Sequence, residues 1–362
     1  MKNSYHYGKS FFIFIPMKDY IIVGGGLAGI CFAEIALQAG KAVVLITDDS
    51  QNSSTVAAGV YNPVVLKRLN ITQDAQEHMD YMAPFYKQVE ERIGVVFNNP
   101  VPVYRRFAGV EEQNNWFAAA DKPSLTAFLS TQIIHKQFEG VDAPYGFGEV
   151  LHTGFMDTTR LLNGYLSYLK KEESLLQETF IHADLQIHDG FVSYRGINAK
   201  HIVFAEGYGI KANPYFNQLP LNGTKGEILI IKAPGLDINF IAKGSVFVLP
   251  FGDGIFKVGA TYEWDDKTTI PTAAARAELV EKLEELITCP YEVIGQLAGI
   301  RPTVKDRKAL VGTHPQYKNI HLLNGLGTRG VILGPPMAKM LFDQIENNIP
   351  VKKEVDLNRF SA

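Results

Sequence analysis

Apolar and polar positions follow two different periods along the first fifty residues. The apolar run over residues 20–23 and the stretch 41–46, which is apolar after Lys41, are typical of strands. Between them, apolar side chains recur every three to four positions over residues 27–38, which predicts a helix, and Gly40 ends it. The order strand, helix, strand predicts a parallel βαβ unit.

The rest of the chain shows the same two periods in another order. Helical spacing covers residues 79–93, 271–288 and a stretch that begins at Asp157 or Thr158 as N-cap. Strand-like runs cover 183–187, 191–194, 201–205, 227–232, 245–250 and 255–262. Antiparallel strands after parallel ones predict a second layer. Residues 101–146 hold many aromatic residues and few periodic segments, which favours an inserted domain or cap.

Composition bounds the class of protein. The chain has 362 residues, 46% of them hydrophobic, which is enough for two domains or one large α/β domain. A formal net charge of -3, without a long basic run, gives no reason to expect nucleic acid as an obligatory partner. The two cysteines lie far apart and show no zinc-site spacing, so we expect no metal and a reducing, cytoplasmic location.

The first sixteen residues carry an apolar run, residues 11–15, after two lysines. This run is too short to span a bilayer and no small-residue cleavage site follows it, so we expect no integral membrane segment. Residues 1–16 are interpreted as an extension or a mis-called start, with Met17 as the functional beginning. A cleaved or anchoring segment is the alternative.

A glycine turn joins the first strand to the first helix. Gly24 allows the tight turn, Gly26 removes the Cβ that would block a pyrophosphate, and Gly29 lets the helix pack close to the strand. The helix begins with Leu27 and Ala28, and its N-terminus favours an anion. This spacing predicts a dinucleotide site.

The end of the second strand offers two polar side chains for the ribose of such a ligand. Thr47 lies where an acidic ribose acceptor is expected, and Asp48 follows as the reserve candidate; both could also be ordinary turn residues. A loop of small residues comes next and brings Ser54, Thr55 and Gly59, either as ligand contacts or as common loop material.

Arg301 stands between Gly299 and Pro302 near the end of the chain. A planar guanidinium pairs with a carboxylate through two parallel hydrogen bonds, so Arg301 suits a substrate carboxylate. A structural salt bridge is the alternative role. A glycine-rich loop, residues 325–330, then leads into a helix that continues to about Asn347.

Together with residues 297–306 and 319–336, these motifs resemble the glycine oxidase and D-amino-acid oxidase (DAO) group of FAD-dependent oxidoreductases, from Met17 to the end of the chain. The resemblance implies an α/β fold, α+β overall, in which a Rossmann-like FAD-binding domain is interleaved with an antiparallel-sheet substrate domain. We assign residues 17–85, 145–215 and 298–362 to the FAD-binding domain, and 86–144 and 216–297 to the substrate domain.

The resemblance also implies the site. Arg301 would hold the substrate carboxylate, while Tyr262 and Phe247 lie on the hairpin that lines the substrate pocket in the family. Phe247 replaces a Tyr found in some glycine oxidases, and Arg329 could compensate or recognise a second acidic group. Glu206 stands where the family commonly has a small residue. Its side chain could contact ribose or could point to solvent. The implied FAD contacts are Gly24, Gly26, Leu27, Ala28, Gly29, Thr47, Asp48, Ser54, Thr55, Gly59, Ala205, Glu206, Gly207, Arg301, Gly325, Gly327, Thr328, Arg329, Gly330 and Val331.

The implied function is oxidation of a small amino or imino acid by hydride transfer to non-covalently bound FAD, with O2 or another electron acceptor as the second partner. No cysteine stands where the sarcosine-oxidase branch attaches its flavin. The alternatives are a 2-hydroxy-acid dehydrogenase of the same fold, an oxidase of a larger amine such as a modified nucleoside, and a non-catalytic flavin-binding module. The oligomeric state stays open.

Overall fold

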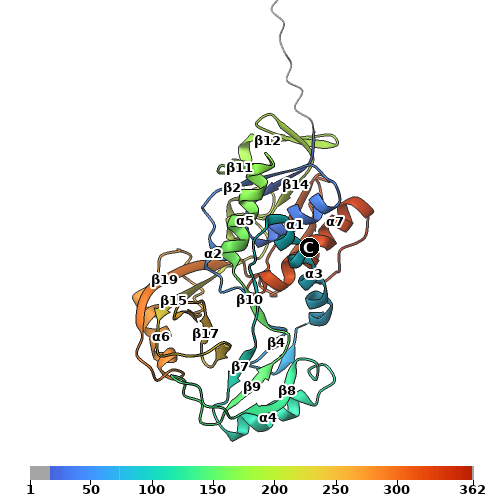
Figure 1. The fold of residues 1–362 in the computed structure, drawn as a ribbon. Coiled ribbons are helices and arrows are strands. Elements are labelled where there is room, and N and C mark those ends of the chain that lie inside the picture. Colours follow the sequence, from blue (N-terminus) through green and yellow to red (C-terminus); the bar gives the residue numbers. More distant parts are fainter. Residues whose placement is uncertain (1–16, 73, 361–362) are drawn as a thin grey trace, which may run out of the picture.

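Two eight-stranded sheets form the framework of the computed structural model, which describes residues 17–72 and 74–360 (Figure 1). The first sheet has a parallel core of five strands, an antiparallel edge strand and an antiparallel hairpin that extends β14. Its parallel strands are, in spatial order, β11 (Leu175–Gln177), β2 (Val43–Thr47), β1 (Lys18–Val23), β14 (Ile197–Phe204) and β21 (Ile320–Asn324). The edge strand is β20 (Leu310–Thr313), and the hairpin is β12 (Leu185–His188) with β13 (Phe191–Tyr194).

The position of the first strand, β1, in the sheet explains why its sequence is apolar without alternation. Tyr20 and Ile22 face one hydrophobic core, Ile21 and Val23 face another, and all four side chains are buried. A strand in the middle of a parallel sheet is covered on both faces, so it has no solvent face for polar residues.

Four helices cover one face of the first sheet: α1 (Leu27–Gln38), α7 (Gly330–Asn347), α3 (Ala75–Ile93) and α5 (Thr158–Lys171). The helix α1 packs directly against α7, and α3 and α5 complete the layer over them. Asp157 caps α5 by accepting a hydrogen bond from the backbone N–H of Arg160. The other face is covered by η2 (Gly207–Ala212) and the residues that follow it.

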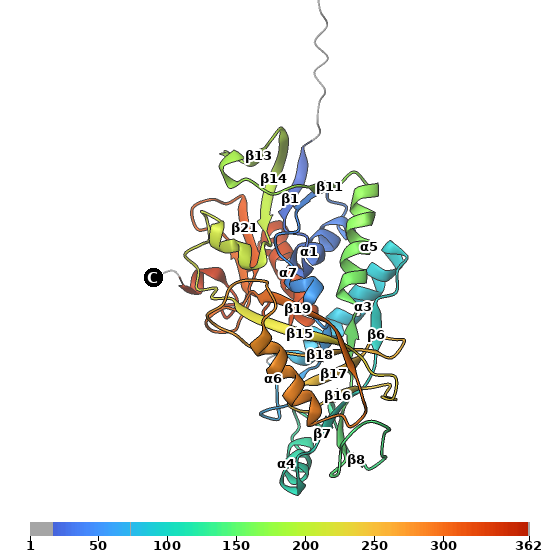
Figure 2. The same cartoon turned by 90° about the vertical axis from the view of Figure 1, so that its left-hand side faces the viewer.

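The second sheet occupies the lower half of Figure 1 and is antiparallel except where β16 meets β7. In Figure 2, α6 (Ala273–Glu284) lies across β15 and β18 on one face of it. The other face holds α4 (Val110–Ala120) at one end and is open to a cavity at the other. In spatial order its strands are β19 (Glu292–Arg301), β15 (Thr224–Lys232), β18 (Ile255–Gly259), β17 (Phe247–Pro250), β16 (Ile241–Lys243), β7 (Val103–Arg106), β9 (Phe147–Val150) and β8 (Leu129–Ile134).

Short elements connect the two layers. The loop after β2 contains the single-turn helix α2 (Ser53–Val56). The remaining strands form a three-stranded sheet and a two-stranded one. They are β3 (Val60–Tyr61), β10 (Gly154–Met156) and β6 (Asn98–Pro100), and β4 (Val64–Val65) with β5 (Asn70–Ile71). The remaining short helices are η1 (His182–Asp184) and η3 (Leu357–Phe360).

The predicted fold class and its main elements are confirmed, and the helices α2 and α4 were not predicted. Within residues 101–146 the chain forms α4, which begins after Gly109 without a side-chain cap and buries Trp116. The domain boundaries remain a prediction. The strand β9 lies in the segment assigned to FAD binding but pairs with β7, and β19 crosses the boundary at residue 298.

The proposed extension, residues 1–16, lies outside the described residues. Within residues 17–72 and 74–360, no helix combines the length and the apolar character needed to cross a bilayer.

Candidate functional site

A cavity of about 1090 Å³ lies between the carboxyl ends of the parallel strands and the open face of the second sheet. Val23, Thr47, Ala205 and Asn324, which end or follow β1, β2, β14 and β21, all line it. Ligands of open α/β sheets bind at this edge, and the volume suits a large ligand.

The turn after β1 requires glycine because other backbone atoms approach it too closely for a side chain. Gly24 has φ +112°, and a Cβ there would lie 2.5 Å from the carbonyl oxygen of Ala205. A Cβ at Gly29 would overlap the carbonyl oxygen of Gly24. Gly29 therefore lets α1 pack against the turn, as its spacing predicts, and it does not line the cavity.

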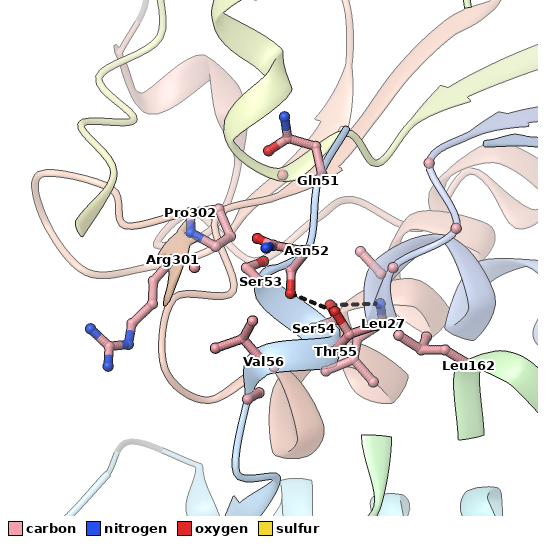
Figure 3. A pocket seen from close by; sticks show the side chains of 18 of the residues that line it. Leu27, Gln51, Asn52, Ser53, Ser54, Thr55, Val56, Leu162, Arg301 and Pro302 are labelled. Atoms are coloured by element: carbon pink, nitrogen blue, oxygen red, sulfur yellow. Dashed lines mark hydrogen bonds between the residues drawn. The ribbon is translucent and has the colours of Figure 1, made fainter. Parts of the chain in front are cut away.

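The N-terminus of α1 faces the cavity and lacks a side-chain cap at Gly26. The backbone N–H of Leu27 donates to Ser54 Oγ at 3.3 Å, as Figure 3 shows. Other N–H groups of the first turn have no intrahelical partner and point towards the cavity end of the helix. A pyrophosphate at this position would meet backbone donors and the positive end of the helix dipole, so the turn fits a dinucleotide.

Thr47 and Asp48 line the cavity beside this turn, and each is already held by a protein partner. Thr47 Oγ1 accepts a hydrogen bond from Gly25 N–H at 3.0 Å. Asp48 accepts hydrogen bonds from the backbone and hydroxyl of Ser50. Burial alone would raise the pKa of Asp48, but its hydrogen bonds with Ser50 and Thr179 bring the pKa below its ordinary value. Asp48 therefore supplies a negatively charged acceptor at the strand end.

Glu206 lines the cavity and does not point to solvent. Its Oε1 lies 2.9 Å from His182 Nε2, and its Oε2 accepts from Asn213 Nδ2 at 2.7 Å. The side chain fixes the segment after β14 by linking it to η1 and to the residue after η2.

The segment Asn52 to Val56 lies between Leu27 and Arg301 in Figure 3. Asn52 Nδ2 donates to Ala298 O at 3.2 Å, while its buried Oδ1 has no partner. A buried amide oxygen without a donor is costly, so it is available to a ligand. The prediction included Ser54 and Thr55 but missed Gln51, Asn52, Ser53 and Val56, which the small-residue loop could have indicated.

Arg301 ends β19 and lines the cavity next to α2. Its Nη1 donates to Thr261 O at 3.1 Å and to Lys225 O at 3.4 Å, and no carboxylate of the described residues pairs with it. The guanidinium lies over the Tyr262 ring, 4.5 Å from Cζ to the ring centroid. Burial lowers the pKa of Arg301, which nevertheless stays charged. The structural salt bridge that was the alternative role is not formed within residues 17–72 and 74–360.

Phe247 and Tyr262 both line the cavity, at different depths. Phe247 is half-buried on β17 opposite Gly259, whereas Tyr262 is 60% exposed beyond the end of β18. The loop that holds Tyr262 is fixed by Lys225, whose buried ammonium donates to Asp266 at 2.6 Å. Tyr262 therefore lies at the mouth, with Arg301 against its ring.

The glycine-rich loop brings the N-terminus of α7 to the cavity, where Gly330 and Val331 line the wall. Gly325 shapes the turn from outside, since a Cβ there would lie 2.6 Å from Val304 Cγ2. Arg329 is the N-cap residue of α7 and lies outside the cavity lining. Burial lowers the pKa of Arg329. Among the described residues, its side chain has no hydrogen-bond or ion-pair partner.

The structure thus brings together most of the predicted site residues. The exceptions, which do not line the cavity, are Gly29, Gly325 and Arg329. The predicted residues that do line it are Gly24, Gly26, Leu27, Ala28, Thr47, Asp48, Ser54, Thr55, Gly59, Ala205, Glu206, Gly207, Phe247, Tyr262, Arg301, Gly327, Thr328, Gly330 and Val331.

The lining contains further residues of the second sheet that sequence reasoning missed: Gly226, Ile228, Lys243, Ser245 and Gly259. They come from the three strands β15, β16 and β18 and from the turn between β16 and β17, and only strand pairing brings them to one wall. Neither cysteine lines the cavity, since Cys31 is buried in α1 and Cys289 follows α6. The described ranges hold no group of three or more histidine, cysteine or acidic side chains arranged for a metal.

Comparison with known proteins identifies this arrangement. The family described as "FAD dependent oxidoreductase" (DAO) matches residues 19–344. The glycine oxidase of Bacillus subtilis (strain 168) is 24% identical over 245 residues, covering 63% of this chain and 64% of the relative. The tRNA 5-methylaminomethyl-2-thiouridine biosynthesis bifunctional protein MnmC of Haemophilus ducreyi is 23% identical and covers 94% of this chain but 58% of its own length.

A solved structure agrees in fold. The iminodiacetate oxidase (IdaA) from Chelativorans sp. BNC1 has a TM-score of 0.73 at 17% identity, covering 92% of this chain and 98% of that one. At this identity the likeness concerns the fold. The matched region of both curated relatives is less than two thirds of their length.

Proposed function

Because this chain belongs to the DAO family of FAD-dependent oxidoreductases, we propose that it oxidises the Cα–N bond of a small amino or imino acid to an imine, by hydride transfer from the Cα–H bond to FAD. The family assignment makes the protein an enzyme with non-covalently bound FAD. The substrate is the part that is proposed.

One observation carries the proposal: the unpaired guanidinium of Arg301 on the cavity wall. Nη1 of Arg301 already donates to two backbone carbonyls, and the other N–H donors of the guanidinium have no described partner. A substrate carboxylate would supply the missing charge and acceptors. A partly desolvated, preorganised cation binds such a group more strongly than an exposed one.

The chain's other residues orient the two reactants. The N-terminus of α1 would hold the pyrophosphate of FAD, and the N-terminus of α7 would face the ring system with backbone N–H groups. FAD supplies the two-electron acceptor when it is bound. Arg301 fixes the carboxylate beside it, so that the Cα–H bond of the substrate points at the ring. The amine binds neutral, and water hydrolyses the resulting imine to a 2-oxo acid and an amine.

A second candidate is a larger amine attached to a nucleoside. Relatives named for tRNA 5-methylaminomethyl-2-thiouridine biosynthesis match up to 94% of this chain, and Tyr262 is exposed at the mouth of the cavity. An exposed aromatic ring beside the carboxylate site offers a stacking surface to a base whose amine substituent enters the cavity.

The test is anaerobic flavin bleaching by the purified, FAD-loaded protein. Glycine, sarcosine, D-alanine and proline represent the first candidate. Uridines with a 5-alkylaminomethyl group, with and without a carboxylate on the alkyl chain, represent the second. Bleaching by an amine supports the proposal, and hydrogen peroxide release in air identifies O2 as the acceptor. Bleaching by a 2-hydroxy acid and by no amine would refute it.

Replacing Arg301 separates its role from general folding. We expect Arg301→Met to raise the KM of a carboxylate-bearing amine about tenfold to a hundredfold, because a charge-assisted hydrogen bond to the substrate is lost. Arg301→Lys keeps the charge but not the bidentate geometry and should lose less. The control is an amine without a carboxylate, whose KM should not change. An equal change for both amines would contradict the carboxylate role.

A further inference from the structure

Lys243 belongs to a row of residues that crosses the wall of the cavity. In the pairing of β16, β17, β18 and β15, Lys243 is opposite Phe247, Phe247 is opposite Gly259, and Gly259 is opposite Ile228. All four line the cavity. Their chain neighbours Ala242, Val248, Val258 and Leu229 are buried in the core beneath α6. Because side chains alternate along a strand, the Lys243 side chain lies on the cavity face of the sheet.

The ammonium of Lys243 has no hydrogen-bond or ion-pair partner among the described residues. The charged groups around it are also cations, Arg105 on β7 and Lys282 on α6. Each of these is already paired, Arg105 with Glu112 at 2.6 Å and Lys282 with Glu278. Burial, with smaller contributions from Arg105 and Lys282, lowers the pKa of Lys243 to about 8. A partly buried cation without a counter-ion is costly, and an anionic ligand would relieve that cost.

The position of Lys243 relative to Arg301 determines how far apart two anionic groups of one ligand would lie. The guanidinium of Arg301 lies over Gly226, two residues along β15 from Ile228. Lys243 is three strands away from Ile228, about 14 Å between backbones at the usual strand spacing. Both side chains are long, so the two cationic heads can approach each other over Phe247 to roughly half of that distance. The wall that the second sheet forms thus presents two cations, Arg301 and Lys243, with Phe247 between them.

We propose that Lys243 binds a second acidic group of the substrate, so that the enzyme's substrate class is amines with two acidic groups separated by several bonds. The inference rests on the proposed function, since Arg301 holds the first carboxylate. Phe247 packs against the apolar chain between the two groups. Lys243 takes the role that sequence reasoning gave to Arg329, which lies outside the cavity lining.

The test uses unreactive probes and reads binding, not turnover. Glutarate and adipate are the dicarboxylate probes, and butyrate and hexanoate are monocarboxylates of comparable length. Each is titrated into the FAD-loaded full chain at pH 7, and the change in flavin absorbance gives its Kd. We expect the wild type to bind one of the dicarboxylates at least tenfold more tightly than its monocarboxylate counterpart, as for a charge-assisted hydrogen bond.

Three variants isolate Lys243. Lys243→Met should abolish the preference for the dicarboxylate, and Lys243→Arg should keep most of it. Lys232→Met removes an exposed lysine from the far end of β15 and should change nothing. If a variant binds FAD poorly, the thermal shift that each probe gives to the apoprotein replaces the absorbance reading. No preference in the wild type, or the same preference in Lys243→Met, overturns the proposal.

The pH dependence adds a signature that a merely structural lysine would not give. Only the protonated ammonium binds an anion, so the dicarboxylate preference of the wild type should fall about tenfold per unit above pH 8. The preference of Lys243→Arg should persist there, because a guanidinium does not lose its proton. Loss at the same pH in both proteins would contradict the role of Lys243.

The outcome is separable from that of the proposed function. If no amine bleaches the flavin but the dicarboxylate preference depends on Lys243, the two-anion site stands and the reaction is wrong. If amines bleach the flavin with the predicted dependence on Arg301, while the probes ignore Lys243, the reaction stands and the second acidic group is wrong.

Discussion

The absence of a side chain at Gly226 determines where the Arg301 guanidinium lies. A Cβ at position 226 would overlap the guanidinium, which rests on the glycine on one side and on Tyr262 on the other. Backbone carbonyls of Lys225 and Thr261 then fix its rotation. The cation is thus held by the sheet itself, and its N–H donors are oriented before a substrate arrives.

Gly226→Ala should therefore weaken carboxylate binding without touching the carboxylate. We expect the Kd of a monocarboxylate probe to rise about tenfold, because the added methyl group displaces the Arg301 guanidinium, so that its hydrogen bonds to the carboxylate are lost. Titration of flavin absorbance measures this.

Gly295→Ala on β19 is the matched control, since a Cβ there would make ordinary contacts at 3.5 Å with Ile230. Equal Kd values for the two alanine variants would show that Gly226 does not position Arg301.

At the scale of elements, α6 and the Tyr262 loop are joined by one buried polar network. Thr272, the N-cap of α6, accepts a hydrogen bond from Ala275 N–H and donates to Glu227 Oε1 at 2.9 Å. Glu227 also accepts from Gln296, and its neighbour Lys225 binds Asp266 in the loop. The helix start and the mouth of the cavity therefore depend on the same strand, β15.

Thr272→Ala should lower the free energy of unfolding by about 1–3 kcal/mol, through the lost cap and the lost donor to a buried carboxylate. Thr272→Ser keeps the hydroxyl and should cost about 0.5 kcal/mol or less. Urea unfolding of the FAD-loaded protein gives both values. A Thr272→Ala protein as stable as Thr272→Ser would mean that the network does not hold α6.

The elements also show which parts of the site could be predicted from the sequence. The glycine turn was predictable because each glycine acts within a few residues of itself, and Arg301 was predictable from its residue type and the family resemblance. Gly226 and Lys243 were not, because their places follow from the register of β15 with β19 and of β16 with β17. Arg329 lies outside the cavity lining, because proximity in sequence to the glycine-rich loop does not fix the direction of a side chain at a helix start. The helix α4 lacks a capping residue, so its start gave no signal.

At the scale of the whole molecule, a ligand in the cavity would lie between the two sheets. The cavity takes one wall from strand ends of the first sheet and the other from a face of the second. Lys243 lies in this wall with a depressed pKa, so its charge affects global stability as well as binding.

The free energy of unfolding should depend on pH through Lys243. Its pKa is about 8 in the folded chain against 10.5 ordinarily. Between these values the unfolded chain binds more protons than the folded one, so stability rises with pH. Without ligand, the wild type should gain about 1–3 kcal/mol relative to Lys243→Met from pH 8 to pH 10.5. Urea unfolding at both pH values measures the gain, with Lys232→Met as the control. Parallel pH profiles for wild type and Lys243→Met would refute it.

The wall formed by the second sheet divides into two parts with different freedom to change. Arg301, Gly226 and Tyr262 depend on one another across β15 and β19, so a substitution at any of them disturbs the others. Lys243 and Phe247 stand on the hairpin of β16 and β17, and among the described residues no side-chain hydrogen bond joins this hairpin to Arg301, Gly226 or Tyr262. Evolution, or a protein engineer, could exchange residues of the hairpin to select new substrates while the carboxylate site and the reaction remain the same.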